Sequence, residues 1–234
     1  MDAVLSAVLE RAKAAAQRRR QQDGSTQPRM PGNADGLSAK ELEQAGICRR
    51  FYGASFAEIE RRGLPGSENI RRNYGKVRTF ADALGENLAQ GMGLILSGSC
   101  GTMKTTMAVA VLRQHLDAGN HGIFVPMCSL VDNLFTMRAL DREEWARYEK
   151  RIRSTQLLVL DDLGGEDTGQ GWIRSKVDSI LTERYNGMRS TIVTTNLLPE
   201  ELESTYSGRI IDRLRSTSIF LTFSGRSERR MGMA

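Results

Sequence analysis

The sequence predicts an α/β fold: a parallel five-stranded sheet with helices on both faces. From residue 77 onward, short β-rich segments alternate with segments of helical periodicity, which is typical of this architecture. Five of these segments are apolar and short enough to be buried strands, at 93–97, 122–126, 156–161, 190–195 and 217–223. We expect helices at 79–90, at 104–118, within 129–152, at 171–186 and, with a break, at 199–214.

The first 45 residues differ in composition from this core. Residues 1–22 have apolar positions at helical spacing and end in three arginines, so they predict a short amphipathic helix with a basic end. Residues 23–37 are rich in glycine and proline, which is typical of a linker, and a second small helix is expected at 38–44. We therefore divide the chain into a helical adaptor segment with linker at 1–45 and a main domain at 46–234.

Composition and charge restrict the possible functions. The chain has 234 residues and a net charge of +5, and 27 of its 33 basic residues are arginine. Arginine pairs well with phosphates, which favours a nucleotide or nucleic acid partner, although a codon bias would give the same count. The apolar runs are too short to span a membrane and the N-terminus does not resemble a secretory signal, so we expect a cytoplasmic protein. Three cysteines without a CxxC pair provide neither a disulfide framework nor a zinc site.

A glycine-containing loop follows the first predicted strand. Residues 93–106 read as an apolar strand, a loop and then Lys-Thr at the start of an alanine-rich helix, which is the context of a phosphate-binding loop. Lys104 would reach the β- and γ-phosphates of ATP, and the Thr105 hydroxyl would bind Mg²⁺. The alternative is an ordinary strand-turn-helix with a capping lysine. The expected nucleotide-binding residues are Gly98, Ser99, Cys100, Gly101, Thr102, Met103, Lys104, Thr105 and Thr106.

Met103 departs from the pattern GxxxxGK[ST], in which a glycine precedes the lysine. Its side chain must point away from the phosphates. If the backbone at this position has a positive φ, methionine costs about 1–3 kcal/mol in strain.

A second apolar strand ends in two carboxylates, Asp161 and Asp162. Ligands of open parallel sheets bind at the carboxyl ends of the strands, where this pair and the phosphate loop should meet. Asp161 is then placed to hold Mg²⁺, and Asp162 to orient the attacking water. The alternative is a pair of aspartates that begins the turn before Gly164 and Gly165.

Two further segments supply candidate catalytic residues. The strand at 190–195 is followed by Asn196, which would face the γ-phosphate if this strand lies beside the acidic one. The short helix around residues 209–215 carries Arg209 and Arg213 on one face. Such an arginine can stabilise transition-state charge on the nucleotide of a neighbouring subunit. The alternative is a solvated basic face.

Together these motifs resemble AAA+ P-loop ATPases of the DnaC/IstB family, which contains bacterial and phage helicase loaders and transposition helper ATPases. The resemblance covers residues 46–223, and Met103 is its principal mismatch. It rests on the phosphate loop at 98–106, the acidic strand at 157–164, the segments at 183–187 and 191–197, the arginine helix at 209–214 and the arginine-rich entry at 49–56.

The resemblance implies a fold with a short N-terminal helical extension and no C-terminal helical lid. It implies that the segment 129–153 helps to engage single-stranded DNA, that Arg213 is an arginine finger with Arg209 beside it, and that the N-terminal segment docks onto a helicase.

The expected function is therefore that of an ATP-dependent DNA replication protein. It would bind ATP with Mg²⁺, assemble as a homo-oligomer, hold single-stranded DNA and deliver a hexameric replicative helicase, with slow hydrolysis stimulated by DNA or the partner. One alternative is a transposition helper ATPase that recruits a transposase. Another is a DNA-binding adaptor that does not hydrolyse ATP.

Overall fold

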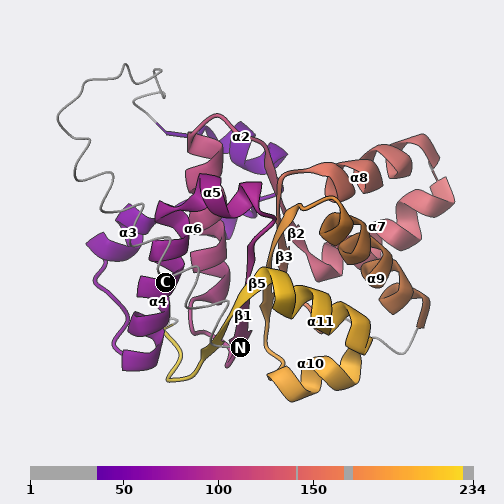
Figure 1. Cartoon of the computed structure of the whole chain (residues 1–234). Helices are drawn as coiled ribbons and strands as arrows, with labels where there is room; N and C mark the ends of the chain where they lie inside the picture. Colours follow the sequence, from indigo (N-terminus) through magenta and orange to yellow (C-terminus); the bar gives the residue numbers. More distant parts are fainter. Residues whose placement is uncertain (1–35, 141, 166–170, 229–234) are drawn as a thin grey trace.

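A parallel five-stranded sheet lies between two layers of helices (Figure 1). This computed structural model describes residues 36–140, 142–165 and 171–228. The strand order is β2-β3-β4-β1-β5, and every neighbouring pair is parallel. The predicted fold class and all five strands are confirmed. The strands are β1 (Gly93–Gly98), β2 (Gly122–Pro126), β3 (Leu157–Asp161), β4 (Ser190–Thr195) and β5 (Ser218–Phe223).

Two apolar cores cover the two faces of the sheet, because alternate side chains of each strand point to opposite sides. On β1, Leu94 and Leu96 belong to one core and Ile95 to the other. The first core lies against α2 (Ala39–Gln44), α3 (Phe56–Arg61), α4 (Glu68–Asp82), α5 (Leu84–Ala89) and α6 (Lys104–Asp117).

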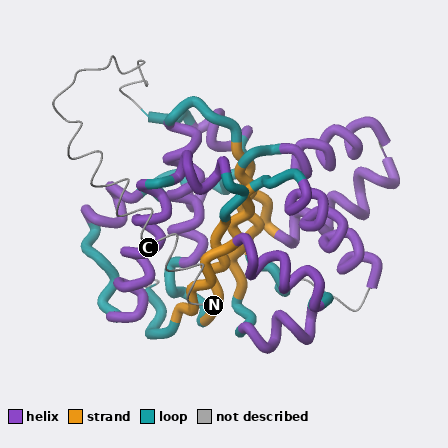
Figure 2. Tube along the Cα trace, in the orientation of Figure 1, coloured by secondary structure: helices purple, strands orange, loops and turns teal. Residues whose placement is uncertain are grey.

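The second core lies against the remaining helices, on the other side of the strands in Figure 2. These are α7 (Met127–Leu140), α8 (Arg142–Ser154), α9 (Gly171–Asn186), α10 (Pro199–Thr205) and α11 (Gly208–Thr217). The predicted break in the helix at 199–214 is confirmed, because Tyr206 and Ser207 separate α10 from α11. Within the part of the chain that the structure describes, no helix is long and apolar enough to cross a membrane.

The segment before β1 is more helical than the sequence analysis predicted. The predicted start of the helix at residue 79 is wrong, because α4 already begins at Glu68. The arginine-rich segment before β1 forms a short 3₁₀ turn (η1, Arg49–Phe51), α3 and the first half of α4. Ile70, Tyr74, Val77 and Phe80 form a buried helical stripe. The arginines occupy the outer face and obscured this periodicity.

Helix α2 packs against the sheet. Ser38 and Glu41 form a capping box at its N-terminus, and Leu42 is buried in the first core. The Phe124 N–H of β2 then donates to the Ala45 carbonyl at 2.7 Å. The amphipathic helix predicted at 1–22 lies outside the described residues, and the division of the chain at residues 45 and 46 stays a prediction.

A buried arginine fixes α8 and α9 to the sheet. Arg184 of α9 is 1% exposed and donates to the carbonyls of Ile152, Thr155 and Ser190 at 2.5–2.8 Å, and to the Thr191 hydroxyl at 2.9 Å. Burial lowers the pKa of Arg184 to about 9, which leaves the side chain charged at neutral pH. Its four acceptors come from the end of α8, the segment before β3, and the start of β4.

Candidate nucleotide-binding site

The candidate site lies at the carboxyl ends of β1, β3 and β4. The phosphate loop follows β1, Asp161 ends β3, and Asn196 follows β4. Since β4 pairs with both β1 and β3, the three strand ends are adjacent. This is the edge of an open parallel sheet at which ligands bind.

The backbone of the phosphate loop has the conformation that the missing glycine would favour. Met103 has φ 68° and ψ 14°, in the left-handed region, and it is the N-cap of α6. Gly98 begins the loop with φ 120°, and a Cβ there would lie 2.0 Å from the Phe223 carbonyl oxygen of β5. The chain therefore tolerates strain of about 1–3 kcal/mol at Met103 but has no space for a side chain at Gly98.

The Lys104 ammonium lies at the centre of the loop. Its Nζ donates to the carbonyls of Gly98 at 2.6 Å and Ser99 at 2.8 Å, and to Asn196 Oδ1 at 3.0 Å. The residue is buried. A lysine that served only at the start of the helix would not need to extend back to the carbonyls of the loop. The position of the Lys104 ammonium therefore favours the phosphate-binding interpretation.

Asp161 lies within reach of the loop. Its Oδ1 accepts from the Thr194 hydroxyl at 2.6 Å, and its carboxylate also receives a hydrogen bond from Thr105. Burial raises the pKa of Asp161, and these two hydrogen bonds lower it by less. Thr105 and Asp161, the two predicted ligands of Mg²⁺, are thus in direct contact.

Asp162 and Asn196 form a second polar contact beside the first. Asp162 has φ 62°, and its carboxylate is exposed and accepts from Asn196 Nδ2 at 2.7 Å. The Asn196 amide therefore bridges Lys104 and Asp162, with its oxygen toward the lysine and its nitrogen toward the carboxylate. The structure brings together Asn196, the predicted water-orienting Asp162 and the phosphate-loop lysine.

The donor set fits a Mg²⁺ ion that shares its ligands with a nucleotide. In proteins, Mg²⁺ is commonly held by one or two carboxylates together with substrate phosphates. Thr105 and Asp161 supply one hydroxyl and one carboxylate. No cluster of three or more His, Cys, Asp or Glu side chains able to hold a metal occurs among the described residues. The site is therefore suited to a metal–nucleotide complex.

The sequence analysis missed two elements of this site. The Thr194 hydroxyl links the acidic pair, since it donates to Asp161 and accepts from the Asp162 N–H at 3.0 Å. Thr194 gave little signal of its own, because the same strand also carries Ser190, Thr191 and Thr195. The segment at 224–228 was also missed, although the Glu228 N–H donates to the Gly101 carbonyl at 2.8 Å. A Cβ at Gly101 would lie 2.1 Å from Ser227 Oγ, so this segment lies directly against the loop.

The structure places Arg213 away from the phosphate loop of its own chain. Gly93 at the start of β1 pairs with Ser218, and the loop follows Gly98 at the other end of the strand. Arg213 lines a pocket with residues that precede β1 and β5, among them Gly91 and Thr217. A six-residue strand is about 20 Å long, which is beyond the reach of one arginine side chain. Arg209, one helical turn earlier, is exposed.

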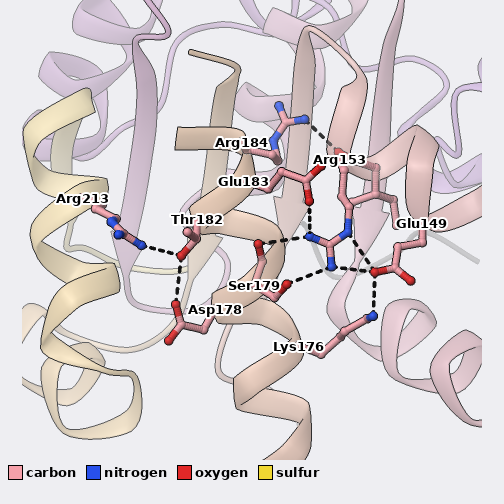
Figure 3. A network of polar contacts seen from close by, with 10 residues as sticks. Glu149, Arg153, Lys176, Asp178, Ser179, Thr182, Glu183, Arg184 and Arg213 are labelled. Atoms are coloured by element: carbon pink, nitrogen blue, oxygen red, sulfur yellow. Dashed lines mark hydrogen bonds and ion pairs between the residues drawn. The ribbon is translucent and has the colours of Figure 1, made fainter. Parts of the chain in front are cut away.

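The predicted DNA-engaging segment at 129–153 forms most of α7 and α8. Arg142 and Arg147 are exposed there, and Arg147 pairs with Glu143 at 3.7 Å. Arg153 faces inward and binds Glu149 and Glu183, so it is not available to DNA (Figure 3). Arg151 donates to the Gln44 carbonyl. The side chain of Arg138 lies outside the described residues.

An exposed aromatic pair joins this segment to the start of α9. Phe135 of α7 and Trp172 of α9 are 47% and 36% exposed, and their ring centroids are 4.9 Å apart in an edge-to-face arrangement. The sequence analysis did not single out either residue. Exposed aromatic rings are typical of surfaces on which bases stack.

Comparisons with known proteins identify the family of the chain. The model of the family described as IstB-like ATP binding protein matches residues 85–231. A replicative helicase loader DnaC from Buchnera aphidicola (strain APS) is 28% identical over 195 residues, which are 81% of this chain and 74% of that protein. A putative insertion sequence ATP-binding protein from Sinorhizobium fredii is 29% identical and covers 75% of this chain and 73% of its own length.

Solved structures give the same result for the fold. The crystal structure of a DnaC helicase loader has a TM-score of 0.66 at 26% identity and covers 76% of this chain and all of that chain. A replication initiator DnaA bound to AMPPCP and single-stranded DNA has a TM-score of 0.58 at 19% identity, covering 70% of this chain and 49% of that chain. The latter likeness concerns the fold alone. The resemblance to the DnaC/IstB family is confirmed.

Proposed function

Because the chain belongs to the family of IstB-like ATP-binding proteins, we propose that it is an ATP-dependent loader that delivers a replicative helicase to single-stranded DNA. The observation that carries the proposal is the contact chain Lys104–Asn196–Asp162, which joins three strand ends around one phosphate position. The DnaC relatives support the loader role.

Each residue of the proposed site has a separate task. Lys104 exchanges its loop carbonyls for the β- and γ-phosphates, since an ammonium prefers phosphate oxygens to neutral acceptors. Thr105 and Asp161 hold the Mg²⁺, which neutralises phosphate charge. Asp162 accepts a proton from, or orients, the attacking water, and Asn196 reports the state of the γ-phosphate to both Lys104 and Asp162.

The first test is ATP binding by Lys104→Ala, measured by titration with a fluorescent ATP analogue in the presence of Mg²⁺. We expect binding to be lost while the circular dichroism spectrum and thermal unfolding stay close to those of the wild type. Lys40→Ala, at an exposed position of α2, is the matched control and should bind normally. Unchanged affinity in Lys104→Ala would refute the site assignment.

Single-stranded DNA binding is proposed for the surface formed by α7, α8 and the start of α9. The exposed Phe135–Trp172 pair and the arginines Arg142 and Arg147 support this, since stacking and phosphate contacts are the two usual components of such binding. Phe135→Ala should weaken binding of an oligonucleotide about 5- to 50-fold, as measured by fluorescence anisotropy. Phe51→Ala, a variant distant from this surface, should leave the affinity unchanged. A strong decrease of affinity with salt is also expected.

A second candidate function is that of a transposition helper ATPase that binds duplex DNA and recruits a transposase. The insertion sequence relative favours it, at an identity similar to that of the DnaC proteins. A pull-down with the full chain in the presence of ATP separates the two proposals. Recovery of a hexameric helicase supports the loader, and recovery of a transposase supports the helper.

A further inference from the structure

We propose that Thr182 and Tyr185 of α9 are positioning residues for Arg213, which they hold in the orientation needed to reach the nucleotide of a second copy of this chain. The inference rests on the proposed function, in which Arg213 acts as an arginine finger. It adds two residues, on a different helix, on which the action of the finger depends.

The contacts of Arg213 come from one face of α9. Its Nη1 donates to Thr182 Oγ1 at 2.5 Å (Figure 3). Its Cζ lies 5.5 Å from the centre of the Tyr185 ring. Thr182 and Tyr185 are three residues apart, so they project from the same side of the helix. The Arg213 guanidinium is therefore bound at Nη1 by the Thr182 hydroxyl and packs over the Tyr185 ring.

The Thr182 hydroxyl is itself oriented. It donates to Asp178 Oδ1 at 3.2 Å, which turns its lone pairs toward Arg213. The other oxygen of Asp178 accepts from the hydroxyl of Ser207, the N-cap of α11, at 3.2 Å. Helix α9 thus contacts α11 at its start through Asp178 and at its middle through Thr182. The position of α11, and with it that of Arg213, is set by α9.

The place of Arg213 in the fold fits action on another molecule. Its own phosphate loop lies at the opposite end of the sheet, as the pairing of β1 with β5 shows. The pocket that it lines also contains Arg189, Tyr185 and Met188, of which Met188 is 61% exposed and Tyr185 40%. A second arginine beside the guanidinium adds positive charge that complements the phosphates of a nucleotide. The pocket is open to a second copy.

Holding the side chain in advance has an energetic benefit. A free arginine side chain loses up to about 2 kcal/mol of rotamer entropy when it is fixed, and a finger fixed by the fold does not lose it during hydrolysis. Loss of Thr182 or of the Tyr185 ring should therefore lower the turnover number at the neighbouring site. ATP affinity at the mutated subunit's own site should not change, because neither residue lies near its phosphate loop.

The test uses mixtures of two inactive variants of the full chain. Acceptor subunits carry Arg213→Ala, so they bind ATP but present no finger. Donor subunits carry Asp162→Asn, so they present a finger but do not hydrolyse. We expect DNA-stimulated hydrolysis to reappear in the mixture, at sites where a donor arginine faces an acceptor nucleotide.

The positioning residues are then changed in the donor only. Donors that also carry Thr182→Val should rescue turnover about tenfold less well, whereas Thr182→Ser, which keeps the hydroxyl, should rescue it fully. Tyr185→Leu should impair rescue and Tyr185→Phe should not, since phenylalanine keeps the ring. The KM for ATP should stay constant throughout.

A readout independent of activity is the mobility of Arg213, followed by the NMR relaxation of its Nε–H group. Thr182→Val should increase this mobility and Thr182→Ser should not. Full rescue by Thr182→Val donors, or an Arg213 equally mobile in wild type and Thr182→Val, would overturn the positioning role alone. Absence of rescue by the simple Asp162→Asn donor would overturn the finger in trans, and the positioning role with it.

Discussion

Met103 is the residue at which this site departs most from the usual phosphate loop, and its left-handed backbone accounts for a specific cost. Glycine would adopt φ 68° freely, methionine does so with strain, and a β-branched residue is worse. We therefore predict that ATP affinity falls in the order Gly, Met, Val at position 103. Titration of Met103→Gly and Met103→Val with a fluorescent ATP analogue checks this order, and equal affinities would contradict it.

Asp161 gives the site a pH dependence with a defined sign. Burial raises its pKa above the ordinary value of 3.8, so folding favours the protonated carboxyl. Below pH 3.8 the group is protonated in both states and has no effect on stability. As the pH rises from 3.8 through the pKa of the folded protein, ionisation of the carboxyl lowers the free energy of unfolding. The loss is about 1.4 kcal/mol for each unit by which folding raises the pKa.

Asp161→Asn should therefore melt at a higher temperature than the wild type at pH 7 without nucleotide, and this advantage should vanish toward pH 4. Thermal unfolding monitored by circular dichroism at a series of pH values measures both. The same variant should lose most of the Mg²⁺ dependence of ATP binding, because the metal requires the carboxylate. A variant less stable than the wild type at pH 7 would contradict the dominance of burial.

At the scale of elements, α9 is the helix that connects the others. It binds α8 through Arg153 and Arg184, and α11 through Thr182 and Asp178 (Figure 3). The sequence predicted its bounds but not this role. Removal of the buried Arg184 should therefore have a measurable effect on the stability of the fold.

Arg184→Ala should destabilise the fold by about 3–5 kcal/mol, because it leaves four buried acceptors unpaired and opens a cavity. Urea unfolding measures this. The control is Arg147→Ala on α8, whose ion pair with Glu143 is largely exposed and should contribute less than about 0.5 kcal/mol. Equal losses in the two variants would refute the role of Arg184.

The elements that the sequence predicted well are those with a single dominant pattern. Short β-branched or apolar runs between helices located all five strands. The parallel sheet placed the motif residues at one edge, but only the strand order, with β4 between β3 and β1, brought them into contact. The helices before β1 were misjudged because arginine covers their outer faces. The segment at 224–228 gave no local signal, since its approach to Gly101 depends on the pairing of β5 with β1.

At the scale of the whole molecule, the two proposed sites lie at opposite ends of the strands. The candidate nucleotide site lies at the carboxyl ends, and the proposed finger lies near the starts. A single copy cannot bring Arg213 to its own phosphates. Efficient hydrolysis should therefore require contact between copies, and the turnover per subunit should increase with protein concentration.

The most direct test of the proposed function is the turnover of ATP in the presence of Mg²⁺, measured per subunit with and without single-stranded DNA and across a range of protein concentrations. We expect slow turnover that increases with DNA and with concentration, and that disappears in both Lys104→Ala and Arg213→Ala. Absence of turnover under every condition would favour an adaptor that does not hydrolyse ATP. Turnover that persists in Lys104→Ala would contradict the assignment of the phosphate loop as the ATP site.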